Sequence, residues 1–284
     1  MILKNSEILL TEPRGFCAGV ERAIEIVNRA VEIFDETIFV KHEVVHNKHV
    51  IEQLVEKGVV FVESLETVPD QSILIYSAHG VSKEISELAI KKRLKVFDAT
   101  CPLVTKVHFE IHKFASQNID VVLVGHSGHP EVEGTMGQYI SEKGKIHLVE
   151  TNDDIKTLKI ENKNIAYVTQ TTLSVDDTKS IVSCLKNKFP NILGPRKDDI
   201  CYATQNRQEA VKKILEFCDS LIVVGSQNSS NSQRLKEIGV QYGIKSYLID
   251  DINQINIDDL SGDEVIGITA GASAPEDNVA SLVK

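Results

Sequence analysis

Three cysteines lie at the same kind of position, each directly before a stretch with the apolar spacing of a helix. They are Cys17, Cys101 and Cys201. The free N–H groups and the dipole of a helix N-terminus favour the thiolate form of cysteine, and thiolates bind soft metals. The three positions therefore predict a shared metal site if the fold brings them together.

Two kinds of metal centre fit three thiolates. A structural zinc ion takes four protein ligands, so it would need a fourth ligand such as histidine. A cubane iron–sulfur cluster usually takes four cysteines, and with three it leaves one iron open to substrate or solvent. The cysteines are 84 and 100 residues apart and form no local cluster motif, so spacing alone does not decide between the two.

A threefold repeat follows the cysteines. In each copy, two further polar loops follow the cysteine segment at similar intervals. The second loops contain His46, His129 and Ser229, which lie 29, 28 and 28 residues after the cysteines. The third loops contain His79, Thr171 and Ser273, which lie 62, 70 and 72 residues after them. Strands alternate with helices, which predicts an α/β fold with mostly parallel sheets and ligands at the carboxyl ends of the strands. A pseudo-threefold arrangement of three similar α/β domains would bring thiols and loops together. The alternative is three unrelated α/β units whose thiols never meet.

The repeat also predicts the boundaries of the elements and domains. The predicted strands span 37–45, 59–62, 72–76, 94–97, 120–124, 145–149, 165–168, 220–224, 245–249 and 264–268. The predicted domains are 16–98, 99–197 and 198–284, with an N-terminal strand over 6–12 added to the third.

The loops carry hydroxyl, imidazole, amide and carboxyl groups and very few basic side chains. Their polar residues are His46, Asn47, His79, His129, Glu131, Thr171, Thr172, Ser229, Ser230, Asn231 and Ser273. Together with N–H groups at helix starts, they are typical of a pocket that binds an anion. Each residue taken singly could instead be a helix cap or turn former. Neither the phosphate-binding Gly-rich loop that ends in Gly-Lys-Ser/Thr nor the dinucleotide fingerprint occurs, so nucleotides are not supported.

The remaining cysteines and histidines suggest structural roles. Cys184 and Cys218 fall within helical patterns and are expected in the core, where a free cysteine behaves as a small hydrophobic residue. His108 and His112 are four residues apart and could bind a metal from one helix face, but we expect that face to be solvated.

Charge and hydropathy limit the partners. The 284-residue chain has a formal net charge of −10, which argues against general binding of nucleic acid or a membrane surface. No apolar run approaches the roughly 18 residues of a membrane span, and the first residues lack a signal-peptide pattern, so a cytoplasmic protein is expected. Five cysteines, an odd number, argue against a disulfide framework. A small-molecule ligand is the expected partner.

Eight motifs, in the same order, resemble those of the 4-hydroxy-3-methylbut-2-enyl diphosphate reductases. This family catalyses the last step of the non-mevalonate isoprenoid pathway. The resemblance runs from about residue 8 to residue 276. The motifs are Arg14-Gly-Phe-Cys-Ala-Gly-Val20, His42-Glu-Val-Val-His-Asn47, Ser77-Ala-His-Gly-Val81, Asp98-Ala-Thr-Cys-Pro102, Gly128-His-Pro-Glu-Val-Glu-Gly-Thr-Met-Gly137, Thr169-Gln-Thr-Thr-Leu-Ser174, Ile200-Cys-Tyr-Ala-Thr-Gln-Asn-Arg207 and Asn228-Ser-Ser-Asn-Ser232.

The resemblance implies a trefoil of three α/β domains around one 4Fe-4S cluster that has three cysteine ligands and one open iron. It implies a reductive dehydration of the allylic diphosphate to isopentenyl and dimethylallyl diphosphates, with electrons from an external donor such as a ferredoxin or flavodoxin system. The implied cluster ligands are Cys17, Cys101 and Cys201. The implied diphosphate ligands are His46, His79, Ser229, Asn231 and Ser273, with His129 and Ser230 beside them.

Glu131 and Thr171 would face the hydroxyl end of the substrate, with Glu131 as the catalytic proton source. The alternative role for Glu131 is to stabilise the start of the following helix. Two departures from the family pattern are visible: Lys83 replaces a frequent proline, and the last helix is expected to be short. A second hypothesis, from another class, is a zinc-stabilised anion-binding or hydrolytic protein that uses the same three cysteines and a loop histidine.

Overall fold

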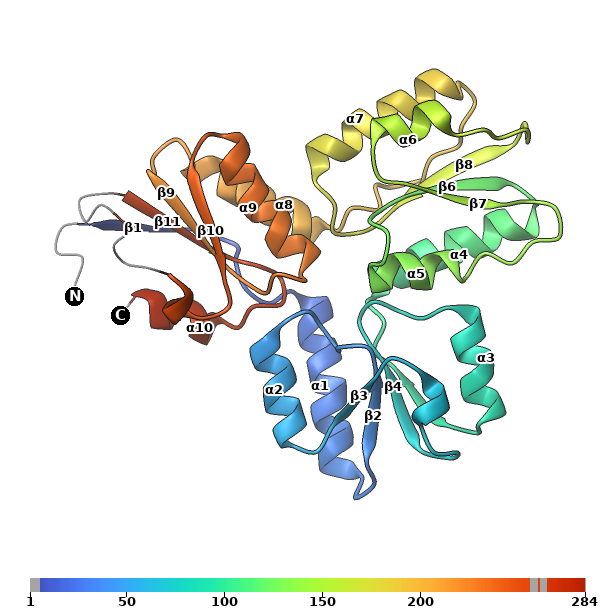
Figure 1. Cartoon of the computed structure of the whole chain (residues 1–284), viewed down its shortest axis with the longest axis horizontal. Helices are drawn as coiled ribbons and strands as arrows, with labels where there is room; N and C mark the ends of the chain where they lie inside the picture. Colours follow the sequence, from blue (N-terminus) through green and yellow to red (C-terminus); the bar gives the residue numbers. More distant parts are fainter. Residues whose placement is uncertain (1–5, 256–259, 261–264, 284) are drawn as a thin grey trace. The chain divides into compact units, whose positions relative to one another are not determined.

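The computed structural model describes residues 6–255, 260 and 265–283 (Figure 1). In this part of the chain all paired strands run parallel, in three sheets. The predicted α/β class with mostly parallel sheets is therefore confirmed. The chain divides into two compact units: unit 1 comprises 1–21, 46–53 and 202–284, and unit 2 comprises 22–45 and 54–201. The finer division into three domains stays a prediction.

Unit 1 contains a sheet with the strand order β1-β11-β9-β10. Its strands are β1 (Glu7–Leu10), β9 (Ser220–Val224), β10 (Lys245–Ile249) and β11 (Val265–Ala270). Its helices are α8 (Tyr202–Ile214), α9 (Ser230–Gln241) and α10 (Glu276–Val283), with a 3-10 turn at Ile252–Gln254. The N-terminal strand thus pairs with β11 at the opposite end of the sequence. The predicted start of that last strand, Glu264, lies outside the described residues.

Unit 2 contains two sheets, with the orders β3-β2-β4-β5 and β7-β6-β8 among the described residues. The strands are β2 (Ile38–Lys41), β3 (Val60–Val62), β4 (Ile73–Tyr76), β5 (Lys95–Asp98), β6 (Asp120–Val124), β7 (Ile146–Val149) and β8 (Ile165–Thr169). The helices are α3 (Lys83–Lys91), α4 (Pro102–Ser116), α5 (Pro130–Met136), α6 (Asn152–Thr157) and α7 (Val175–Lys188), with a 3-10 turn at Leu65–Thr67. Helices α1 (Ala18–Ile33) and α2 (Lys48–Glu56) each have residues in both units.

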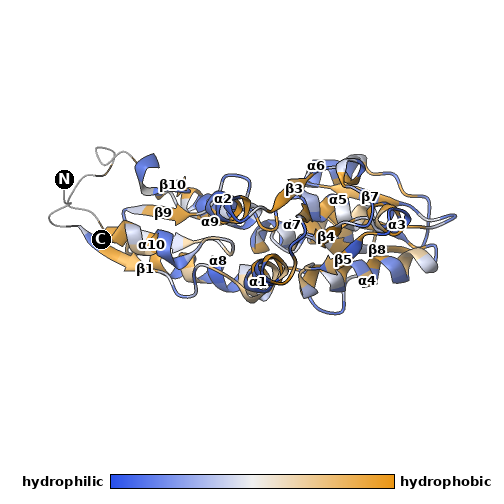
Figure 2. Ribbon diagram, turned by 90° about the horizontal axis from the view of Figure 1, so that it is seen from below, coloured by the Kyte–Doolittle hydropathy of each residue, from blue (hydrophilic) through white to orange (hydrophobic). Residues whose placement is uncertain are grey.

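The central strands are mostly apolar, as is typical of parallel strands that helices cover on both faces of the sheet. Every residue of β4, β6, β8 and β9 is buried. Figure 2 shows β4, β8 and β9 largely in the hydrophobic colour and the helices in mixed colours. The polar segments that follow the strands are therefore fixed at the ends of rigid elements.

One predicted strand is too long. The prediction spanned 37–45, but β2 ends at Lys41. The next residue, His42, has a φ of 60°, in the left-handed region, and this turns the chain out of the sheet. The segment 42–45 therefore forms a loop.

Candidate functional site

The three helix-start cysteines share one backbone geometry. Helices α1, α4 and α8 each begin at the residue directly after the cysteine. The cysteine N–H donates a hydrogen bond to a carbonyl in a loop after a strand: Cys17 to Ala272 (3.1 Å), Cys101 to Ala78 (3.0 Å) and Cys201 to Thr171 (2.9 Å). Each acceptor is the second residue after its strand, β11, β4 or β8. The threefold repeat that the spacing predicts is thus present in the backbone.

The same contacts correct the alignment of the third loops. The intervals from the cysteines matched Thr171 with His79 and Ser273. The backbone instead matches Thr171 with Ala78 and Ala272, so the counterpart of His79 and Ser273 is the next residue, Thr172. Thr172 accepts a hydrogen bond from the Gln170 side chain (3.0 Å). Loop lengths that differ between the copies caused the one-residue shift.

The second loops begin helices, and their polar residues serve as caps. The side chains of Asn47, His129 and Ser229 accept hydrogen bonds from the first turns of α2, α5 and α9. The acceptor atom of His129 is Nδ1, 3.1 Å from the Glu131 amide nitrogen. The ring nitrogen that accepts this hydrogen bond carries no proton. His129 therefore serves as the N-cap of α5.

In unit 1, the predicted site residues form one connected group. The Ser273 hydroxyl donates to the His46 carbonyl (2.7 Å), and the neighbouring Ala272 amide donates to Asn231 Oδ1 (2.8 Å). The Ala272 carbonyl accepts from the Cys17 amide (3.1 Å). Ser229 and Ser230 lie at the start of the same helix as Asn231.

Asn231 carries a donor suited to a ligand. Its side chain lies in a residue that is only 4% exposed, and Nδ2 is buried without a hydrogen-bond partner among the residues that the structure describes. A buried amide donor left unpaired costs about 1–3 kcal/mol, so such groups usually have a functional partner. An anionic ligand would satisfy it.

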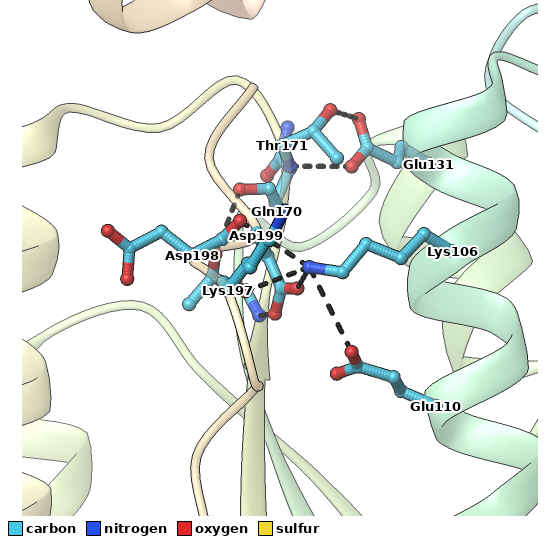
Figure 3. Close-up of polar contacts among 9 residues, drawn as sticks. Lys106, Glu110, Glu131, Gln170, Thr171, Lys197, Asp198 and Asp199 are labelled. Carbon is cyan, nitrogen blue, oxygen red and sulfur yellow. Dashed lines mark hydrogen bonds and ion pairs between the residues drawn. The ribbon is translucent and has the colours of Figure 1, made fainter. Parts of the chain in front are cut away.

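In unit 2, two sets of contacts involve further predicted site residues. The rings of His79 and His129 meet edge to face with centroids 5.8 Å apart. Two residues after His129, the Glu131 carboxylate accepts hydrogen bonds from the Thr171 amide (2.6 Å) and hydroxyl (3.0 Å), as Figure 3 shows. The Thr171 carbonyl in turn accepts from the Cys201 amide (2.9 Å). A carboxyl group is thereby linked to a cysteine-bearing segment through one residue.

Glu131 is electrostatically unusual. It is 4% exposed, and burial raises its pKa from 4.5 to about 7, although the two hydrogen bonds from Thr171 act in the opposite direction. A carboxyl group with a pKa near the working pH can both donate and accept a proton. Both of its hydrogen bonds go to Thr171 and the cap of α5 is His129, so the contacts favour a chemical role over a capping role.

Sequence reasoning missed an ion pair that holds the Cys201 segment to α4. Lys106 Nζ contacts Asp199 Oδ1 (3.0 Å) and donates to the Lys197 carbonyl (2.8 Å) (Figure 3). Asp199 Oδ2 accepts from the Thr169 amide (3.0 Å). The Asp199 side chain is fully buried, at 0% exposed. Lys106 lies in α4, the helix that directly follows Cys101, and Asp199 lies two residues before Cys201. The pair therefore fixes the spacing of two cysteine segments within unit 2.

Lys106→Met is expected to destabilise the apoprotein by about 2–3 kcal/mol. The change leaves the buried Asp199 carboxylate without its cation, which costs roughly 3–5 kcal/mol for a fully buried pair. We expect less because 31% of the Lys106 side chain is exposed. The measurement is the free energy of unfolding in urea. The matched control is Lys83→Met, whose 4.0 Å pair with Glu87 lies at the surface and should contribute about 0.5 kcal/mol or less. Equal losses in the two variants would contradict the role of the pair.

The expectation of a solvated helix face is wrong for His108, which is buried, whereas His112 is exposed as expected. His108 is 8% exposed, and burial is the main cause that lowers its pKa to about 4. A Cβ at Gly80 would lie 2.7 Å from the His108 ring, and Gly80 has a φ of 76°. Only glycine suits this close approach and this backbone. The neutral His108 ring thus packs against the loop that carries His79.

Arg207 is a buried cation that sequence reasoning did not single out. Its guanidinium donates to the carbonyls of Gly15 (2.5 Å) and Phe16 (3.1 Å), the two residues before Cys17. Its position six residues after Cys201 gave no signal, because the contact crosses 192 residues of sequence. Arg207 fixes the Cys17 segment from helix α8.

The described residues show neither a metal-binding group within one unit nor a membrane-spanning helix. Neither unit contains there, by itself, a group of three or more His, Cys, Asp or Glu side chains placed to hold a metal ion. Cys17 lies in unit 1, whereas Cys101 and Cys201 lie in unit 2. None of the five cysteines is in a disulfide. None of the helices in residues 6–255 and 265–283 has the length and apolar character to cross a bilayer.

Comparison with known proteins gives one consistent family. Residues 8–284 match the family model described as "LytB protein". The 4-hydroxy-3-methylbut-2-enyl diphosphate reductase of Methylococcus capsulatus is 60% identical over 95% of this chain and 87% of its own length, and that of Aeromonas hydrophila is 58% identical over 97% and 89%. The structure of the Plasmodium falciparum E-1-hydroxy-2-methyl-but-2-enyl-4-diphosphate reductase superposes with a TM-score of 0.94, at 44% identity, over 98% of this chain and 87% of that chain. A second solved reductase, titled the terminal enzyme of the non-mevalonate pathway, gives a TM-score of 0.69 at 32% identity, over 98% of both chains.

Proposed function

Because this chain belongs to the LytB protein family, we propose that it reduces 4-hydroxy-3-methylbut-2-enyl diphosphate to isopentenyl and dimethylallyl diphosphates. The resemblance seen in the eight motifs is confirmed by the family match and by relatives of that name. The reaction consumes two electrons and two protons and releases water. The observation that carries the proposal is the buried Glu131 carboxyl, with a pKa near 7, joined through Thr171 to the Cys201 segment.

Cys17, Cys101 and Cys201 are the proposed ligands of one 4Fe-4S cluster with an open iron. The donor set fits: three cysteines outside any disulfide stand at helix N-termini with equivalent backbone contacts, where the thiolate is favoured. When bound, such a cluster supplies electrons and Lewis-acid polarisation of the leaving hydroxyl group. Lys106, Asp199 and Arg207 hold the cysteine segments in place through the contacts described above.

The diphosphate is the proposed ligand of the hydroxyl, imidazole and amide groups. These are His46, His79, Ser229, Asn231 and Ser273, with His129 and Ser230 beside them. The unpaired Asn231 amide and the α9 N-terminus are suited to oxyanions. Because the diphosphate is remote from the bond that breaks, its binding energy can position the alcohol for reaction.

Glu131 is the proposed source of the proton that leaves with the hydroxyl group as water. Thr171 orients the carboxyl with two hydrogen bonds, and burial keeps it protonated over part of the neutral range. After donation, the carboxylate keeps both donors from Thr171, which stabilise the charge. An external carrier such as a ferredoxin or flavodoxin system is the proposed electron source. A cytoplasmic location stays a prediction.

The proposal is tested with anaerobically reconstituted protein and a small-molecule reductant. We expect iron and sulfide in the protein and conversion of the allylic diphosphate to the two five-carbon diphosphates. The alcohol without its diphosphate should bind at least ten-fold more weakly, since each lost hydrogen bond to a charged group contributes about 1.5–3 kcal/mol. Zinc without iron or sulfide, and no product, would instead support the zinc-protein hypothesis.

A further inference from the structure

Unit 2 contains an open groove of about 880 Å³ along helix α4. Its lining includes Thr100 and Pro102, the residues on either side of Cys101. Phe109 and Leu193, which also line it, are 69% and 51% exposed. An exposed phenylalanine and leucine beside a proposed cluster ligand are typical of a protein contact surface rather than of a small-molecule pocket.

The charge of the groove differs in sign from that of the chain. Four basic side chains line it, those of Arg22, Lys106, Lys113 and Arg196, against two acidic side chains, those of Asp98 and Glu110. The formal surplus of two positive charges falls to about one once the pairing of Lys106 with Asp199 is counted, on a chain with a net charge of −10. The Lys106 charge is largely neutralised by Asp199, but Arg22, Lys113 and Arg196 are exposed. A local positive patch on an acidic protein attracts an acidic partner and orients it.

We propose that this groove is the docking surface for the electron donor, a small acidic one-electron carrier protein. The inference rests on the proposed function, because only a protein that receives electrons from outside needs such a surface. Electron transfer weakens steeply with distance, so the carrier should bind where a ligand segment reaches the surface, and the groove adjoins the Cys101 segment. Interfaces of transient redox pairs are small and depend on charge for orientation.

The test measures the rate at which an acidic reduced ferredoxin of known sequence reduces the reconstituted protein in stopped flow. The double variant Lys113→Glu/Arg196→Glu is expected to lower the second-order rate constant about ten-fold or more at low ionic strength. The difference from wild type should shrink as salt is added, because these exposed charges become screened. Reduction by methyl viologen radical, which is itself a cation, should not slow down.

The matched control is Lys91→Glu/Lys186→Glu, with the same total change in charge. Both lysines are exposed and lie in the last turns of helices, α3 and α7, as Lys113 does in α4. The proposal is overturned if the groove variant slows no more than this control, or if it slows equally with methyl viologen. Self-association that the groove variant abolishes, with unchanged reduction by ferredoxin, would assign the groove to a second copy and also overturn it. A wild-type protein that neither reductant reduces would contradict the proposed function itself.

Discussion

Cys101→Ser is expected to lose most of its iron and nearly all turnover, and the same holds for Cys17→Ser and Cys201→Ser. A serine hydroxyl stays protonated at neutral pH, whereas the ligand of a soft metal is the thiolate. The backbone contact of residue 101 with the Ala78 carbonyl does not involve the side chain and should persist. Iron and sulfide per chain, the visible absorption and turnover are the measurements.

Cys184→Ser and Cys218→Ser are the controls. Cys184 is half-buried in α7, and Cys218 is buried beside the unit 1 sheet, so both have ordinary packing roles. The expected helical position is wrong for Cys218, because α8 ends at Ile214. We expect near-normal iron content and activity in both, with a modest loss of stability. A Cys101→Ser protein that keeps a full cluster and full activity would refute the ligand assignment.

Glu131→Gln is expected to reduce turnover by about 10² to 10⁴, the usual contribution of general acid catalysis. Glutamine keeps an acceptor for the Thr171 amide, and the Thr171 hydroxyl can rotate to accept from the new amide group. The shape and the contacts are therefore retained while the transferable proton is lost. The cluster absorption and the affinity for the diphosphate should survive, and steady-state and binding measurements on one preparation check both.

The pH dependence of stability provides a second readout for Glu131. A carboxyl whose pKa is raised on folding stabilises the protein below its unfolded pKa, near 4.5, and this contribution is lost as the pH rises through about 7. The stability of the wild type relative to the Gln variant should therefore fall across that window. Glu133→Gln, in the same first turn of α5 but exposed, should change neither turnover nor this profile. A Glu131→Gln variant that turns over normally but melts earlier would favour the structural role.

Local sequence patterns predicted the parts that local physics determines. Apolar runs such as 120–124 and 220–224 became buried parallel strands, and the thiols stand at helix starts. The matched intervals predicted the repeat because each copy repeats the same strand, loop and helix order. His79 with His129, and Glu131 with Thr171, lie together as the repeat implied for loops at the ends of strands.

The missed features depend on tertiary contacts or on single backbone angles. Lys106 and Asp199 are 93 residues apart in the sequence. Neither residue by itself differs in sequence from an ordinary exposed charged residue. His108 lies in a helix with several charged residues, but its ring is buried where Gly80 approaches it closely. The shift from Thr171 to Thr172 follows from loop lengths, and the end of β2 follows from the left-handed His42. Periodicity contains no information on any of these.

The residue directly before helix α4 has a consequence for protein engineering. Cys101 is its N-cap and makes no capping hydrogen bond with its side chain, whereas Ser82, Thr151, Ser174 and Ser229 cap their helices in the usual way. A serine at an N-cap typically contributes about 1 kcal/mol. The Cys101→Ser apoprotein should thus melt no lower than the wild-type apoprotein, and a selection for thermostability carried out without cofactor would enrich inactive chains. Libraries designed to stabilise this protein should hold positions 17, 101 and 201 constant and be screened as loaded enzyme.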